Sequence, residues 1–117
     1  MRIFKTKLFA QWAKRLKLTD VVLKKSVDEL LRGQYEANLG GYLYKKRVPI
    51  DSRGKKGALR IIIAFKKGQD VFFVYGFRKS VKANISFKEL ELLKELASDL
   101  FSLDRKLLKG KTLIEVL

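Results

Sequence analysis

The chain has 117 residues, of which 47% are hydrophobic, and it carries 27 Lys and Arg against 12 Asp and Glu, a net charge of +15. The absence of Cys and His excludes disulfides, zinc fingers and Cys or His nucleophiles, so any catalysis must use Lys, Arg, Tyr, Ser, Thr or carboxylates. No stretch approaches the roughly 18 uncharged apolar residues of a membrane span and no signal peptide is evident, so we expect one cytoplasmic domain, 1–117, without a membrane partner.

The amino-terminal third predicts a strand followed by a helical hairpin. Residues 2–6 read as a short strand. Apolar residues then recur at the spacing of one helix face, at Phe9, Trp12, Ala13 and Leu16. Thr19 or Asp20 is placed to cap a second helix, which Gly33 ends. Its apolar face is predicted to hold Leu23, Val27, Leu30 and Leu31.

The middle of the chain predicts three strands. Segments 42–48, 59–65 and 70–77 are rich in aromatic and β-branched residues and are separated by turn-forming stretches. The turn 66–69 is short enough to join the last two strands as an antiparallel hairpin.

The carboxy-terminal third predicts a helix and an edge strand. Ser86 and Glu89 fit a capping box, in which each residue satisfies a backbone amide of the other. The buried face of this helix is predicted to hold Phe87, Leu90, Leu93, Ala97 and Leu100. Gly110 ends the connection to a final strand at 112–116. The order βααβββαβ predicts an α+β fold with an antiparallel central sheet, an amino-terminal helical hairpin and a carboxy-terminal helix.

Basic residues gather on three consecutive strands. The second of these strands alternates so that Arg60 points away from its apolar face. On the strand before it, Lys45 and Arg47 share one face, and Arg78 and Lys79 follow the strand after it. These three strands therefore predict a shared concavity lined by cations.

Most of the excess charge lies in this part of the chain. Residues 40–82 hold 12 of the 27 basic residues and only two of the 12 acidic residues. A patch of this kind is typical of a protein that binds phosphate groups, and the alternative is a solubilising surface. The residues predicted to contact RNA or phosphate are Lys45, Arg47, Arg53, Lys56, Arg78 and Lys82, with Tyr44 stacking on a base.

Two segments of this region resemble a known family. Residues 54–65 read GKKGALRIIIAF, and residues 75–90 read YGFRKSVKANISFKEL. In this order and at this separation they resemble the RelE/ParE-type toxins of bacterial toxin-antitoxin modules, in particular their HigB-like branch. Ala58 stands where that branch has a second glycine. The resemblance covers nearly the whole chain and implies the RelE-like fold, βααβββα.

The resemblance also implies an activity and a partner. Members commonly act as metal-independent messenger RNA endoribonucleases without a cofactor, many of them cutting at the ribosomal A site and so inhibiting translation and growth. A cognate antitoxin silences them, in this branch often one with a helix-turn-helix domain. The matching catalytic or RNA-contacting positions are Arg47, Lys55, Arg60 and Lys79.

RNA cleavage without histidine leaves the proton transfers to lysine. An unperturbed Lys, with a pKa of about 10.4, is neutral at pH 7 in about one molecule in 2,500, a cost of roughly 4.6 kcal/mol. Neighbouring cations lower that cost because they favour the neutral amine. The hypothesis is Lys55 as base or proton shuttle, Arg60 as phosphate clamp and Lys79 as leaving-group acid or second clamp. The identity of the general base stays open.

Two other functions fit the same composition. ParE-like relatives inhibit DNA gyrase without cutting RNA, and they do not need the set Lys55, Arg60 and Lys79. A non-catalytic basic domain would use the same cations only to hold nucleic acid phosphates.

Overall fold

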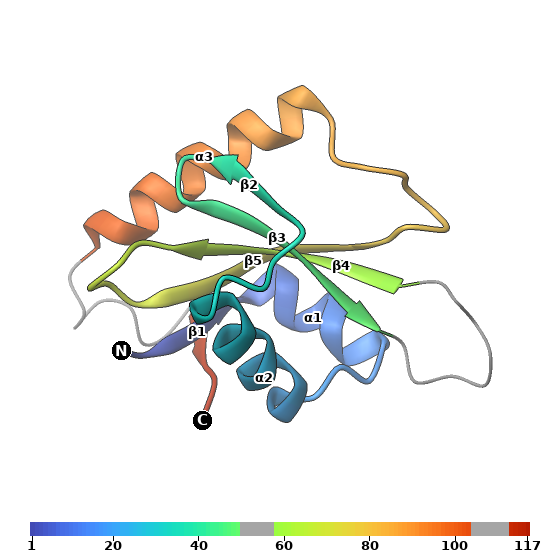
Figure 1. The fold of residues 1–117 in the computed structure, drawn as a ribbon, viewed down its shortest axis with the longest axis horizontal. Coiled ribbons are helices and arrows are strands. Elements are labelled where there is room, and N and C mark those ends of the chain that lie inside the picture. The colour runs from blue at the N-terminus through green and yellow to red at the C-terminus, as the bar shows by residue number, and fades with distance from the viewer. Residues whose placement is uncertain (50–57, 104–112) are drawn as a thin grey trace.

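The structure is a computed structural model that describes residues 1–49, 58–103 and 113–117. Three layers are visible, with α3 on one face of a twisted sheet and α1 and α2 on the other (Figure 1). In chain order the elements are β1 (Ile3–Thr6), α1 (Lys7–Arg15), α2 (Asp20–Leu31), β2 (Ala37–Gly40), β3 (Leu43–Pro49), β4 (Ala58–Phe65), β5 (Val71–Arg78), α3 (Phe87–Ser102) and β6 (Leu113–Glu115).

The strands form one sheet in the order β2-β3-β4-β5-β1-β6. All neighbours are antiparallel except β1 and β5, which run parallel. The predicted α+β class and its helical hairpin, central strands and carboxy-terminal helix are confirmed, and the last strand, β6, pairs with β1 at one edge. The sheet is thus mostly antiparallel, as expected for a RelE-like fold.

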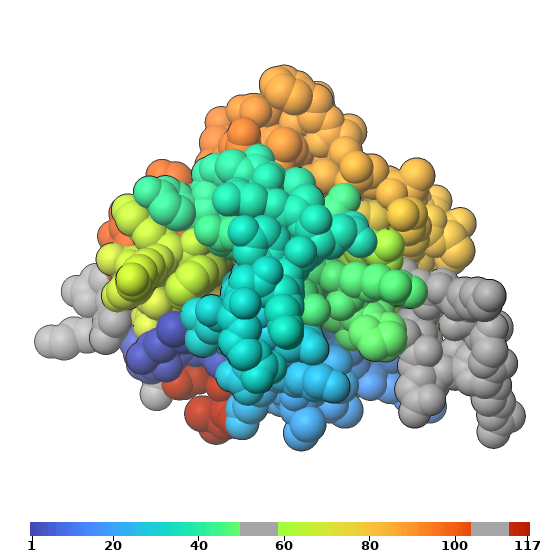
Figure 2. Space-filling model, viewed as in Figure 1, coloured from blue at the N-terminus to red at the C-terminus, as the bar shows by residue number. Residues whose placement is uncertain are grey.

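The sequence prediction missed β2, the strand at the other edge. Its four residues, ANLG, include no aromatic or β-branched side chain, so nothing in its composition indicates a strand. Pairing with β3 creates it, with Ala37 opposite Lys45 and Asn38 opposite Tyr44. Figure 2 shows the β2–β3 region at the surface, between α3 and the helical hairpin.

Both faces of the sheet are buried. We expected the core on the face of Leu59 and Ile61, and that face does pack against α1 and α2. The opposite face is a second core beneath α3, where Ile62 and Ala64 of β4 have no exposed surface. The basic residues predicted to point away from the core therefore emerge from a sheet that is covered on both sides.

Helix caps follow the sequence closely. Thr19 caps α2 by accepting a hydrogen bond from the amide of Val22, and the capping box of Ser86 and Glu89 opens α3. Two expected core residues are instead exposed, Leu31 at 47% and Phe87 at 78%. Leu31 lies at the edge of the buried arc of α2, and Phe87 begins α3, whose first turn stands away from the sheet (Figure 1).

None of the helices in the described parts of the chain combines the length and the apolar character that crossing a membrane requires.

Candidate functional site

The central strands align the basic residues on the α3 side of the sheet. Arg47 of β3 is directly opposite Arg60 of β4, and Arg60 is opposite Phe77 of β5. Lys45 lies one step along the same face, opposite Ile62. Since side chains of directly paired residues stand about 5 Å apart at Cβ, the register brings Lys45, Arg47 and Arg60 into one group.

Arg60 is the buried member of this group, with only 7% of its surface exposed. Its Nε donates to Glu36, at 3.0 Å from Oε1 and 2.9 Å from Oε2. Lys45 Nζ lies 3.2 Å from the same Oε1. Among the described residues, Nη1 of Arg60 is buried and has no hydrogen-bond partner. A buried cationic donor of this kind is costly to leave unpaired, so a ligand that supplies an acceptor gains correspondingly.

Glu36 holds two of the three cations in place. Partial burial by itself raises the pKa of Glu36, but the hydrogen bonds from Arg60 and Lys45 outweigh burial and leave its pKa below the usual value. The carboxylate is therefore ionised at neutral pH, and its two oxygens fix the Nε edge of the guanidinium. Arg47, by contrast, is exposed.

A second cluster lies further along the same face. Tyr75, opposite Ile62 on β5, donates its hydroxyl to Glu89 Oε2 at 3.1 Å. Lys82 Nζ donates to the Tyr75 hydroxyl at 3.3 Å, pairs with Glu89 and lies 5.6 Å from the centroid of the Tyr75 ring. The other oxygen of Glu89 accepts from the amide of Ser86 at 2.9 Å. These contacts tie the connection between β5 and α3 to both elements.

The charges of Glu89 and Lys82 are fixed at neutral pH. The hydrogen bond from Lys82, followed by that from the Ser86 amide, lowers the pKa of Glu89 to about 2, and the hydrogen bond to Glu89 raises the pKa of Lys82. Neither group is suited to exchange a proton near pH 7. The cluster is suited instead to positioning the chain that carries Lys79.

Stability at acid pH should report on Glu89. Because its folded pKa lies below the ordinary value of 4.5, its contribution to stability is complete above pH 4.5 and is lost as the pH falls toward about 2. We expect Glu89→Gln to be less stable than wild type at neutral pH, with the difference shrinking across that window. Urea unfolding at several pH values measures it, with Glu91→Gln on the exposed side of α3 as the control. An equal difference at every pH would contradict the assignment.

The remaining predicted site residues fall into three groups. Arg78 and Lys79 are exposed at the end of β5 and in the turn after it. Tyr44 lies on the opposite face from Arg60, where its ring is 4.9 Å from that of Tyr35 and 6.4 Å from that of Phe65. The loop residues lie outside the described part of the chain: Arg53, Lys55 and Lys56.

Three functional candidates, Glu36, Tyr75 and Glu89, were not among the site residues predicted from the sequence. Glu36 reaches Arg60 across β3, and only the missed strand β2 places it there. Tyr75 and Glu89 both belong to segment 75–90, the second of the two segments that carry the family resemblance, and their direct contact gives a reason for their shared presence in it. Within residues 1–49, 58–103 and 113–117, no three acidic side chains gather closely enough to hold a metal ion.

Comparison with known proteins gives one match. The family model described as the RelE toxin of the RelE/RelB toxin-antitoxin system matches residues 1–116. No curated protein and no solved structure gives a significant match. Because the family model spans nearly the whole chain, the chain belongs to the RelE toxin family, and as the toxin of a type II toxin-antitoxin system it implies a cognate antitoxin as its partner.

Proposed function

We propose that this RelE-family toxin is a messenger RNA endoribonuclease that inhibits translation and growth. The observation that carries the proposal is Arg60, a buried guanidinium held at Nε by Glu36, with Nη1 unpaired among the described residues. An arginine oriented in this way suits a phosphate oxygen, and it stands beside the exposed Arg47.

The proposed reaction uses the RNA's own hydroxyl. The 2′-oxygen attacks the adjacent phosphorus and gives up its proton, the bond from phosphorus to the 5′-oxygen breaks, and the 5′-oxygen takes up a proton. The products are a 2′,3′-cyclic phosphate and a 5′-hydroxyl. Arg60 would stabilise the charge that builds on the non-bridging oxygens, and this stabilisation is strongest when the donor is oriented beforehand and shielded from water. Glu36 would provide that orientation.

Two lysines are proposed for the proton transfers. Lys55 is the proposed base or proton shuttle, an assignment that rests on the sequence. Lys79 is the proposed leaving-group acid or second phosphate clamp, and the cluster of Tyr75, Lys82 and Glu89 supports its turn from one side. Since Lys82 is committed to Glu89, the neighbouring exposed cations Arg78 and Lys79 are better placed to meet RNA.

RNA contacts would then extend over the exposed cations around Arg60. Arg47 on the same face, and Arg78 on the opposite face at the end of β5, would contact phosphates. Arg53 and Lys56 stay proposed for the same role from the sequence. Lys45 is shared with Glu36, so its contribution would be partly neutralised. Tyr75 lies on the face of Arg60 whereas Tyr44 lies on the other, so Tyr75 is the better placed aromatic for a base at the cut site.

Primer extension on messenger RNA after induction of the toxin tests the proposal. We expect new 5′ ends inside reading frames within the period in which growth stops, and their dependence on active ribosomes decides whether the ribosome is a required partner. An SOS response without new ends would instead indicate a gyrase inhibitor. Bound but uncut RNA would indicate a non-catalytic nucleic acid-binding domain.

The finer assignment to a branch is also a proposal. Residues 54–65 and 75–90 favour the HigB-like branch, whose antitoxins often carry a helix-turn-helix domain. An antitoxin of that kind, encoded beside the toxin and suppressing its growth arrest on co-expression, is the expected partner. The proposed site of action is the cytoplasm.

A further inference from the structure

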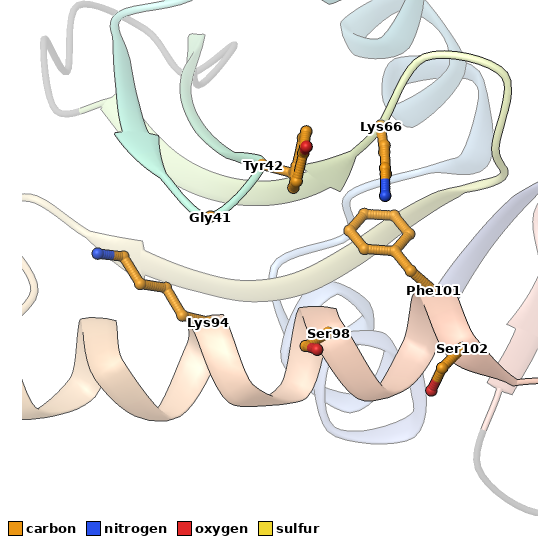
Figure 3. Close-up of a pocket in the computed structure, with 7 residues that line it drawn as sticks. All are labelled: Gly41, Tyr42, Lys66, Lys94, Ser98, Phe101 and Ser102. Atoms are coloured by element: carbon orange, nitrogen blue, oxygen red, sulfur yellow. The ribbon is translucent and has the colours of Figure 1, made fainter.

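A pocket of about 370 Å³ lies away from the Arg60 group, between two turns of the sheet and the second half of α3. Figure 3 shows Lys66 extending from the β4–β5 turn toward the ring of Phe101, and Lys94 running beneath Gly41. The residues that matter for its chemistry are Gly41, Tyr42, Lys66, Lys94, Ser98 and Phe101. None of them belongs to the site described above.

The backbone at Tyr42 is strained. Gly41 and Tyr42 form the two-residue turn between β2 and β3, with Gly40 paired to Leu43, and their φ angles are +59° and +65°. A turn of this shape favours glycine or asparagine, because a larger side chain is crowded in the left-handed region. Tyr42 is also 50% exposed, so burial does not explain it. An exposed aromatic kept at a strained position indicates a role in binding.

The pocket combines aromatic rings with ammonium groups. The rings of Tyr42 and Phe101 meet edge to face at 6.0 Å, and Lys66 Nζ lies 5.0 Å from the centroid of the Tyr42 ring. Lys66 has no ion pair within the described part of the chain, and Lys94 has a distant one, 3.8 Å from Glu91. An unpaired cation beside an exposed ring suits a phosphate attached to a flat base.

The glycine at position 41 leaves room for this arrangement. A Cβ there would lie 2.8 Å from Cγ of Lys94, closer than packed atoms approach. The aliphatic part of Lys94 therefore lies flat against the turn, and its ammonium group lies near Gly40, pointing away from Lys66 (Figure 3). The absence of a side chain at Gly41 thus determines where the Lys94 side chain lies.

We propose that this pocket binds one nucleotide of a single-stranded RNA, with its base against Tyr42 and Phe101 and its phosphate at Lys66. This inference rests on the proposed function, because it takes the same RNA to lie along β3. Tyr42 is five strand residues from Arg47, about 17 Å at 3.4 Å per residue. The pocket would hold a nucleotide outside the cut site. It would thereby increase the affinity for RNA and fix which phosphate of the bound strand lies at the cut site.

Binding of a fluorescent 2′-O-methyl dodecanucleotide, which cannot be cut by its own hydroxyl, tests the pocket directly. Base stacking on an aromatic residue is worth about 1–3 kcal/mol, so we expect Tyr42→Gly to weaken binding about tenfold. The same variant should unfold at or above the wild-type temperature, because glycine fits the left-handed turn. Weaker binding by a protein that is no less stable separates binding from folding.

The matched test of charge uses two adjacent lysines. Lys66→Ala should reduce the slope of log affinity against log salt by about 0.7, the value for one phosphate contact on a single strand. Lys67→Ala, in the same turn but outside the pocket lining, should leave the slope unchanged. Equal slopes for the Lys66 and Lys67 variants would overturn the phosphate contact.

The remaining outcomes distinguish this inference from the proposed function. Unchanged oligonucleotide binding by Tyr42→Gly would overturn the pocket assignment while cleavage of messenger RNA still supports the nuclease. Binding that depends on Tyr42 in a protein that cuts no RNA would support the pocket and remove the nuclease. Loss of antitoxin binding in Tyr42→Gly, with oligonucleotide binding intact, would make the pocket a protein-docking site and overturn the inference.

Discussion

Replacing Arg60 with alanine is expected to reduce messenger RNA cleavage at least about a hundredfold and to abolish growth arrest, since one preorganised donor to a developing oxyanion is typically worth that much. The guanidinium is buried, its Nε edge is fixed by Glu36, and Nη1 has no partner among the described residues. Primer extension and growth curves after induction measure the effect.

Two companion variants make the Arg60 result specific. Arg60→Lys keeps the charge but loses the planar fork that lets one edge bind Glu36 and another bind phosphate, so we expect it to recover little activity. Arg32→Ala removes the same charge from the exposed carboxy-terminal end of α2 and should cleave like wild type. Full cleavage by a folded Arg60→Ala protein would remove Arg60 from the mechanism.

Local signals in the sequence predicted most elements of the fold. Thr19 and Ser86 mark helix starts because their side chains satisfy amides within a few residues, and such contacts can be recognised from spacing alone. The parallel pairing of β1 with β5 could not be predicted in this way. It joins Phe4 to Phe72, and the choice of neighbour is made by the packing of the whole sheet.

The site was predictable only where strand alternation decides it. Alternation grouped Lys45 with Arg47, and the register of β3 and β4 then places Arg60 on the same side. Glu36 could not be foreseen, because its position depends on an edge strand without strand-forming residues. Tyr44 could have been excluded from the site on the sequence alone, because alternation puts it on the opposite face of the strand from Lys45. In the structure it packs beside Tyr35.

A large loss of stability is expected on substituting Gly76, which belongs to segment 75–90. It lies within β5 opposite Ile61, and Trp12 of α1 lies directly over it. A Cβ at this position would overlap the Trp12 ring, and the nearby ring of Phe9 at 5.6 Å restricts how far that ring can move. We expect Gly76→Ala to lower the free energy of unfolding by about 3 kcal/mol, the upper part of the usual range for overpacking. Thermal and urea unfolding measure the loss.

A double-mutant cycle with Trp12→Leu separates this clash from a general preference for glycine. The smaller side chain leaves room for a methyl group, so Gly76→Ala should cost much less in that background than in wild type. Gly68→Ala provides the comparison, because its φ of +83° is unfavourable for alanine but nothing lies within 4 Å of the added atom. An equal cost of Gly76→Ala in both backgrounds would exclude the Trp12 contact as the cause. If the cycle shows the expected coupling, Gly76 is required for the close approach of α1 to the sheet. Of the neighbours Tyr75 and Gly76, only Tyr75 then contributes to the proposed RNA site.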